Sequence, residues 1–200
     1  MKKFVNYLTR ELQLSEEKSE IIEYGLFSLL YSWLSIFTAL VLGALFGLWQ
    51  ETIAIMFMVM LYRKVSGGAH IGTPLGCLIT GTAAILLLAS FTSVFGPKLA
   101  GNLIFAILSL AITFIIAYIW VPADVPQKPI TDPQQIKKLR ALSFCLILAW
   151  GLAGIFLFWR SQQFAYYYFA GNLGLLWQSF LLTPPGYSFT AYLDRFFVKK

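Results

Sequence analysis

Charged residues are scarce in this sequence. Only 12% of its 200 residues are Asp, Glu, Lys or Arg, whereas 58% are hydrophobic and 17% are aromatic. A soluble domain has about one quarter of its residues charged, so this composition indicates an integral membrane protein. Because no polar stretch is long enough to fold separately, we expect one integral membrane domain over residues 1–200.

Metal ligands and disulfide partners are also few. The chain has one histidine, His70, and two cysteines, Cys77 and Cys145, which lie far apart without CxxC or CxxH spacing. This pattern argues against a structural zinc site and against a structural disulfide. We therefore expect neither a metal nor a bound cofactor.

The net charge of +6 does not indicate nucleic-acid binding. A nucleic-acid surface needs Lys and Arg clustered with aromatic side chains on one exposed face. Here the basic residues fall between apolar runs, which favours a role in membrane topology and no nucleic-acid partner.

The first twenty residues are too charged to contain the apolar core of a cleavable signal peptide. Within residues 1–20, Phe4, Tyr7, Leu8 and Leu12 recur at spacings of three and four, which predicts an amphipathic helical segment. Such a segment either lies flat on the inner leaflet or packs against the membrane helices, and the sequence leaves both arrangements open.

Long apolar runs predict an all-α polytopic protein with six transmembrane helices. An apolar run of about 18 residues crosses the hydrocarbon core, whereas the second run is shorter and reaches only ~22 Å as a helix. We count it because Glu51 can face one interface while Arg63 and Lys64 reach the other. The expected spans are about 23–45, 48–62, 74–95, 99–120, 141–159 and 164–182.

The distribution of positive charge predicts the orientation. With six spans and a cytoplasmic N-terminus, thirteen of the fifteen Lys and Arg residues fall on the cytoplasmic side, and only Lys98 and Arg160 fall outside. The positive-inside rule therefore places both termini in the cytoplasm, together with residues 63–77 and the Pro-rich loop 121–140.

Polar, reactive and backbone-permissive residues crowd between Arg63 and Cys77. His70 and Cys77 are seven residues apart, which on a straight helix separates them by ~10 Å, too far for a hydrogen bond. However, Thr73 and Pro74 are typical of a helix start, with Thr73 as the N-cap. We therefore expect His70 to precede the helix and fold back toward Cys77 in its first turn.

Cysteine with histidine forms a sufficient nucleophile and base, since the imidazole and the positive end of a helix both favour the thiolate. Gly67 and Gly68 can present backbone N–H groups as an oxyanion hole, and Arg63 can hold a substrate carboxylate or carbonyl. The plainer alternatives are a structural histidine and a cysteine that merely packs in the core. We give Cys145 that second interpretation.

The same residues resemble the signature of a known family. Arg, Gly-Gly, His and a Cys seven residues later resemble the accessory gene regulator B (AgrB) family, membrane cysteine endopeptidases of Gram-positive bacteria that process a quorum-sensing propeptide. The Pro-Ala-Asp loop of that family is similar to a second stretch here. The matching segments are Arg63, Gly67-Gly68, His70, Cys77, Val121–Asp124 and Lys128–Ile130.

The resemblance implies a specific reaction. Cys77 would attack a peptide carbonyl, with His70 acting first as base and then as acid. A cysteine or serine of the peptide would then capture the thioester, which gives a thiolactone or lactone ring. It further implies a short amphipathic AgrD-like propeptide, a homodimer, and a multi-pass protein of the cell membrane with its site facing the cytoplasm. Asp124 is a candidate third residue, although its loop is equally explained as a structural corner.

Two other functions are compatible with the sequence. In a small-peptide or ion transporter, Arg63 and His70 would line a polar path, and in an acyltransferase Cys77 would carry a lipid. A transporter of ions or protons is expected to place several ionisable groups at mid-membrane depth. Here they lie near the predicted interfaces, which favours the peptidase.

Overall fold

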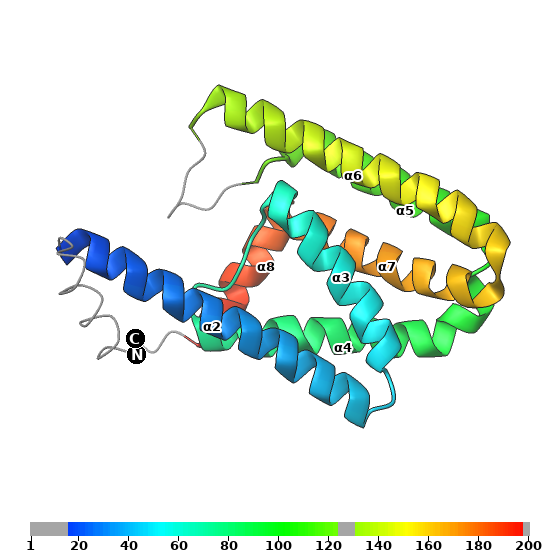
Figure 1. The fold of residues 1–200 in the computed structure, drawn as a ribbon, viewed down its shortest axis with the longest axis horizontal. Helices are drawn as coiled ribbons and strands as arrows, with labels where there is room; N and C mark the ends of the chain where they lie inside the picture. Colours follow the sequence, from blue (N-terminus) through cyan, green and yellow to red (C-terminus); the bar gives the residue numbers. More distant parts are fainter. Residues whose placement is uncertain (1–15, 124–130, 198–200) are drawn as a thin grey trace.

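The computed structural model of the chain describes residues 16–123 and 131–197. The predicted all-α class is confirmed, since these residues form seven helices (Figure 1). The helices are α2 (Glu16–Leu45), α3 (Trp49–Ser66), α4 (Pro74–Leu99), α5 (Leu103–Trp120), α6 (Pro133–Arg160), α7 (Gln162–Phe180) and α8 (Pro184–Asp194). Most of the predicted amphipathic segment, Asp124 and Lys128–Ile130 lie outside the described residues.

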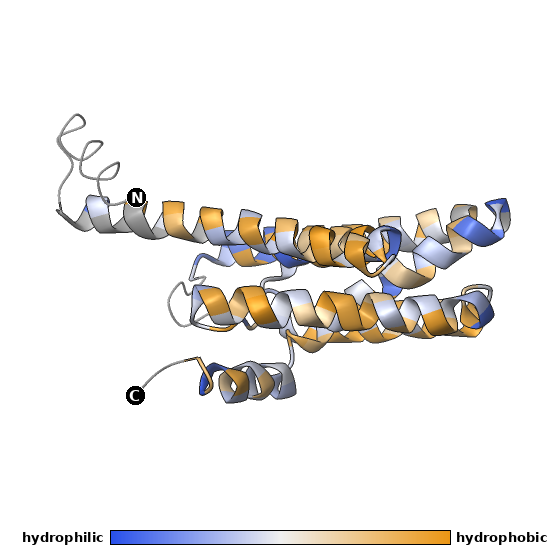
Figure 2. Ribbon diagram, turned by 90° about the horizontal axis from the view of Figure 1, so that it is seen from below, coloured by the Kyte–Doolittle hydropathy of each residue, from blue (hydrophilic) through white to orange (hydrophobic). Residues whose placement is uncertain are grey.

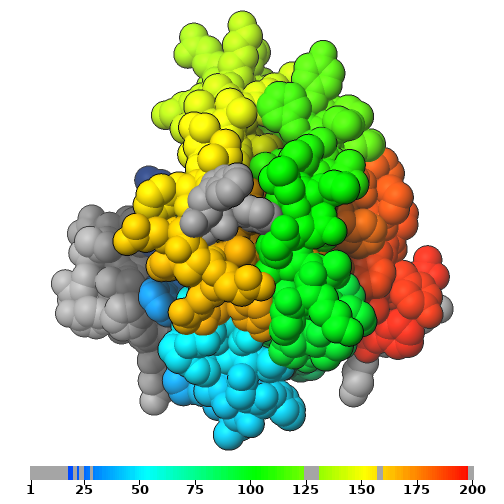
Figure 3. Space-filling model, turned by 90° about the vertical axis from the view of Figure 1, so that its right-hand side faces the viewer, coloured from blue at the N-terminus to red at the C-terminus, as the bar shows by residue number. Residues whose placement is uncertain are grey.

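The six longer helices run back and forth along the bundle, with α7 at its centre (Figure 1). Helix α7 contacts α3, α4, α5 and α6, and its packing against α3 is the most extensive of any pair. Figure 3 shows the start of α7 enclosed by the ends of its neighbours. Helix α2 packs against α3 and α4, whereas α5 and α6 pair on another side of α7.

Small residues allow α3 and α7 to approach closely. A Cβ atom on Gly174 of α7 would lie 2.6 Å from the Ile55 carbonyl oxygen of α3. Buried polar groups add hydrogen bonds, because Trp150 donates to Asn172 Oδ1 at 2.8 Å and Tyr166 donates to Glu51 at 2.6 Å. Close backbone approach and interhelical hydrogen bonds are what hold helices together in lipid.

Apolar side chains face outward along most of the bundle, and hydrophilic residues gather mainly toward the helix ends (Figure 2). Four helices are long and apolar enough to cross a membrane: α2 over Gly25–Leu45, α4, α5, and α6 over Pro133–Phe156. Helices α3 and α7 carry more polar groups and are the most enclosed. The number of crossings, six, and the position of the termini stay predictions.

Two helix boundaries correct the sequence interpretation. The span predicted to end near residue 95 continues as helix α4 to Leu99, because Pro97 lies close to the helix end, where few turns remain for it to disrupt. The loop expected over residues 121–140 is shorter, because α6 begins at Pro133. Asp132 Oδ1 accepts from Gln134 N at 2.9 Å, so proline here starts a helix instead of breaking one.

Helix α8 was not predicted. Its prolines occupy the first two helical positions, and Thr183 Oγ1 accepts from the Gly186 N–H at 3.3 Å. Phe189 packs edge-on against Trp177 and Phe180 of α7. The chain therefore folds back after α7 and brings Asp194 and Phe197 against Gly72 and Gly76 at the start of α4.

The predicted orientation can be tested with two exposed lysines, Lys98 near the end of α4 and Lys137 near the start of α6. These helix termini lie at opposite ends of the bundle (Figure 1). In a chain carrying Cys77→Ala and Cys145→Ala, we expect Lys137→Cys to react with a membrane-impermeant maleimide applied from the cytoplasmic side. Lys98→Cys should react only from the other side. Equal labelling of both from one side would contradict the orientation.

Candidate functional site

The connection between α3 and α4 turns sharply at two glycines. Gly67 and Gly68 have φ angles of 72° and 125°, a region that disfavours other residues. The Gly67 N–H closes α3 by bonding the Arg63 carbonyl at 3.0 Å, and the Gly68 N–H bonds the Ala123 carbonyl at 2.9 Å. Ala123 N–H in turn bonds the Ser66 carbonyl at 2.8 Å. The glycines thus join the loop to the segment that follows α5.

These bonds correct the predicted oxyanion hole. The N–H groups of Gly67 and Gly68 already have backbone partners, so neither is free to bind an oxyanion. Open donors are expected instead in the first turn of α4, at Leu75 and Gly76, because the first N–H groups of a helix have no intrahelical acceptor. Thr73 occupies the N-cap position, as predicted, but its side chain makes no capping hydrogen bond.

Arg63 faces the loop backbone. Its Nη2 atom donates to the carbonyls of Gly68 at 3.4 Å and Ala69 at 3.0 Å, and its Nη1 atom donates to Gln178 Oε1 at 3.3 Å. We expected this guanidinium to bind a substrate, but it donates hydrogen bonds to the carbonyls of the loop and to Gln178.

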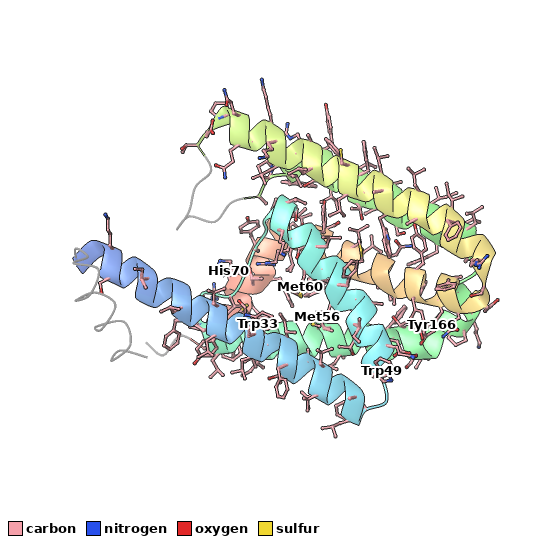
Figure 4. All side chains as sticks on the ribbon, viewed as in Figure 1. Trp33, Trp49, Met56, Met60, His70 and Tyr166 are labelled. Carbon is pink, nitrogen blue, oxygen red and sulfur yellow. The ribbon has the colours of Figure 1, made fainter. Side chains whose placement is uncertain are left out.

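His70 is exposed on the loop, at the end of the bundle where α8 lies (Figure 4). Its Nδ1 atom is 3.1 Å from the Ile71 carbonyl oxygen. A carbonyl only accepts hydrogen bonds, so in the neutral imidazole this contact assigns the proton to Nδ1 and the lone pair to Nε2. That tautomer has the free nitrogen that a general base needs.

Cys77 is exposed in the first turn of α4, as predicted, and its N–H bonds the Thr73 carbonyl at 2.9 Å. Within the described residues, no hydrogen bond joins His70 and Cys77. Such bonds are often long in the absence of substrate. Cys145 was expected in the core, but it is exposed on α6, because that helix buries only part of its surface.

Asp194 was not anticipated near this site. Its Oδ2 atom lies 3.0 Å from the position that a Cβ on Gly72 would take, and its buried Oδ1 atom has no hydrogen-bond partner. Phe197 lies over Gly76 in the same way. The sequence marks Asp194 only as an acidic residue in an otherwise basic tail. Its position beside Gly72 depends on helix α8, which was not predicted. No group of His, Cys, Asp or Glu that could hold a metal occurs among residues 16–123 and 131–197.

A family model and a curated relative each match most of this chain. The family model described as accessory gene regulator B matches residues 1–182. A putative AgrB-like protein 2 of Clostridium perfringens (strain 13 / Type A) is 27% identical, over 94% of this chain and 92% of its own length. A putative AgrB-like protein of Clostridium beijerinckii is 37% identical over 43% of each chain. No solved structure matches the chain.

The contact between Gly67 and Ala123 can be tested with a matched pair of substitutions. A Cβ on Gly67 would lie 2.0 Å from the Ala123 carbonyl oxygen, whereas a Cβ on Gly47 would meet nothing within 4 Å. Both glycines have positive φ angles, 72° and 70°, which alanine disfavours, and Gly67 also has a ψ of −146°, a combination that is almost restricted to glycine. We expect Gly67→Ala to lower the stability by a further roughly 1–3 kcal/mol.

Thermal unfolding of the detergent-purified variants measures this difference. Gly67→Ala should unfold at a clearly lower temperature than Gly47→Ala. Equal midpoints would show that the loop does not depend on its pairing with residues 121–123.

Proposed function

The chain belongs to the accessory gene regulator B family, and on that basis we propose that it is a membrane cysteine endopeptidase with Cys77 as nucleophile and His70 as general base. The observation that carries this proposal is the local geometry. The Ile71 carbonyl holds the His70 ring with its Nε2 lone pair available, on the loop that leads directly into the helical turn bearing Cys77.

The first half of the reaction forms a thioester. His70 Nε2 takes the proton from Cys77 Sγ, and the thiolate attacks the carbonyl carbon of the scissile peptide bond. The C–N bond then breaks, and the departing amine takes the proton from His70. The first-turn N–H groups of α4 and its helix dipole stabilise the negative charge that develops on sulfur and oxygen.

The second half closes a ring. A cysteine thiol or serine hydroxyl within the bound peptide attacks the thioester carbonyl, which releases Cys77 and gives a thiolactone or lactone. This transfer keeps the acyl group activated, so the site must favour the peptide's own nucleophile over water. The substrate in this proposal is a short AgrD-like propeptide, and cleavage takes place at the cytoplasmic face.

The hydrogen bonds of Arg63 argue against the transporter alternative. A polar path would need its guanidinium to face a passing solute, yet three of its hydrogen bonds go to the protein's own loop and to Gln178. His70 is exposed on the loop between α3 and α4, at the end of the bundle.

Replacement of the two proposed catalytic residues tests the function. In membranes incubated with a synthetic AgrD-like propeptide, we expect Cys77→Ala to abolish cleavage, because no other nucleophile lies in the first turn of α4. His70→Ala should lower the rate by about 10²- to 10⁴-fold, the usual contribution of a general base. Mass spectrometry of the peptide products measures both.

Cys145→Ala is the matched control, because this cysteine is equally exposed but lies on α6. It should cleave at the unsubstituted rate. Cleavage by Cys77→Ala at a comparable rate would overturn the proposed function, and loss of cleavage in Cys145→Ala would reassign the nucleophile.

A further inference from the structure

Gln178 is a fully buried amide near the end of α7, with 0% of its surface exposed. Its Nε2 atom donates to the Gly67 carbonyl at 2.7 Å, and its Oε1 atom accepts from Arg63 at 3.3 Å. These partners are 111 and 115 residues away in the chain. A buried amide is unfavourable by about 1–3 kcal/mol unless it is hydrogen-bonded, and here both ends of the amide are used.

The backbone just before His70 is completely hydrogen-bonded. The N–H groups of residues 67, 68 and 69 donate to the carbonyls of Arg63, Ala123 and Leu181. Their three carbonyls accept from side chains, the first from Gln178 and the other two from Arg63. All six polar groups of this segment are therefore fixed by partners on α3, α7 and the segments that follow α5 and α7.

Only an amide side chain of this length can make both of the Gln178 bonds. It needs a donor for the Gly67 carbonyl and an acceptor for Arg63, and glutamine carries one of each. A carboxylate would keep the bond to Arg63 but would place a second oxygen against the Gly67 carbonyl. A thioether or alkyl chain would make neither bond. A satisfied buried network of this kind specifies one geometry.

We propose that Gln178, acting together with Arg63, is a positioning residue that fixes the backbone preceding His70 so that the imidazole can reach Cys77. This inference rests on the proposed peptidase function. Gln178 does not touch the substrate, because it is fully buried. The sequence predicts that Arg63 contacts the substrate. In this proposal Arg63 instead positions the loop, as Gln178 does.

The decisive substitutions are Gln178→Met, which keeps the side-chain length and removes both hydrogen bonds, and Gln178→Glu, which keeps only the bond to Arg63. Ser179→Ala is the matched control. Ser179 is the next residue, is also 0% exposed, and bonds Leu175 and Thr113, away from the loop. Each variant is made in the full-length protein and purified in detergent.

The first measurement does not depend on activity. Hydrogen–deuterium exchange followed by mass spectrometry reports on the peptide that contains residues 67–69. We expect faster exchange of this peptide in Gln178→Met and Gln178→Glu than in the unsubstituted protein, and unchanged exchange in Ser179→Ala. Unchanged exchange in folded Gln178 variants would overturn the proposal. Should Gln178→Met fail to fold, Gln178→Glu carries the test, since it retains the Arg63 bond.

The second measurement is single-turnover cleavage of the synthetic propeptide. A misplacement of about 1 Å costs roughly 10²-fold in rate, so we expect the maximal rate constant of Gln178→Met to fall by roughly 10- to 100-fold. The peptide concentration at half-saturation should stay within about twofold, because Gln178 does not contact substrate. Faster exchange with an unchanged rate constant would overturn the positioning role and leave the peptidase intact.

Failure of the proposed function gives a different pattern. If Cys77→Ala cleaves as fast as the unsubstituted protein, the peptidase proposal is wrong, and the catalytic part of this inference falls with it. A lower rate constant in Gln178→Met together with full activity of Ser179→Ala, inactivity of Cys77→Ala and faster exchange of residues 67–69 would support both.

Discussion

Backbone that is not helical must find hydrogen-bond partners when it lies at or near a membrane, because lipid supplies none. The loop after α3 meets this constraint with the side chain of Arg63, in the last turn of α3, and with three groups from distant parts of the chain: Gln178 and the carbonyls of Ala123 and Leu181. The ends of α3 and α7 and the segment after α5 are held together by the same bonds. The loop is thus the point where the C-terminal ends of α3, α5 and α7 are joined.

This constraint also explains why α3 and α7 are less apolar than their neighbours. Helices in lipid gain little from burying apolar surface against each other, so they associate through close packing and hydrogen bonds. Gly174 permits the approach, and Asn172, Gln178 and Glu51 supply the bonds. A helix that carries these groups becomes the centre of the bundle, and the more apolar α4 and α5 are left to face outward.

The start of α4 and the order of the helices were predictable from local sequence. An N-cap residue followed by proline marks a helix start, and a long apolar run marks a membrane helix, and neither signal depends on distant parts of the chain. The use of Gly67 and Gly68 was not predictable in this way. Their positive φ angles follow from the residue type, but the Gly68 N–H bonds Ala123 and the Gly67 carbonyl accepts from Gln178, and both partners lie beyond residue 120. Gln178 and Asp194 reach the site only through α7 and α8, so no spacing in residues 63–77 indicates them. The start of α6 at Pro133 was not predicted, because a proline-rich stretch favours a loop unless the N-cap residue before the proline, here Asp132, is taken into account.

In the proposed peptidase, the backbone fixed on both sides of residues 70–73 explains how His70 and Cys77 can act together without a hydrogen bond in the free protein. On one side, every N–H and carbonyl group of residues 67–69 is bonded, and on the other side α4 begins at Pro74 with the Cys77 N–H bonded to the Thr73 carbonyl. Only residues 70–73 lie between these two fixed segments, and the His70 ring hydrogen-bonds to the carbonyl of the next residue, Ile71. A short segment between two anchors has few alternative positions, so little ordering entropy remains to be lost when a substrate brings imidazole and thiol together. In the proposed peptidase, the backbone before His70 is therefore held largely by the side chains of Arg63 and Gln178, which bond to the loop and not to the substrate.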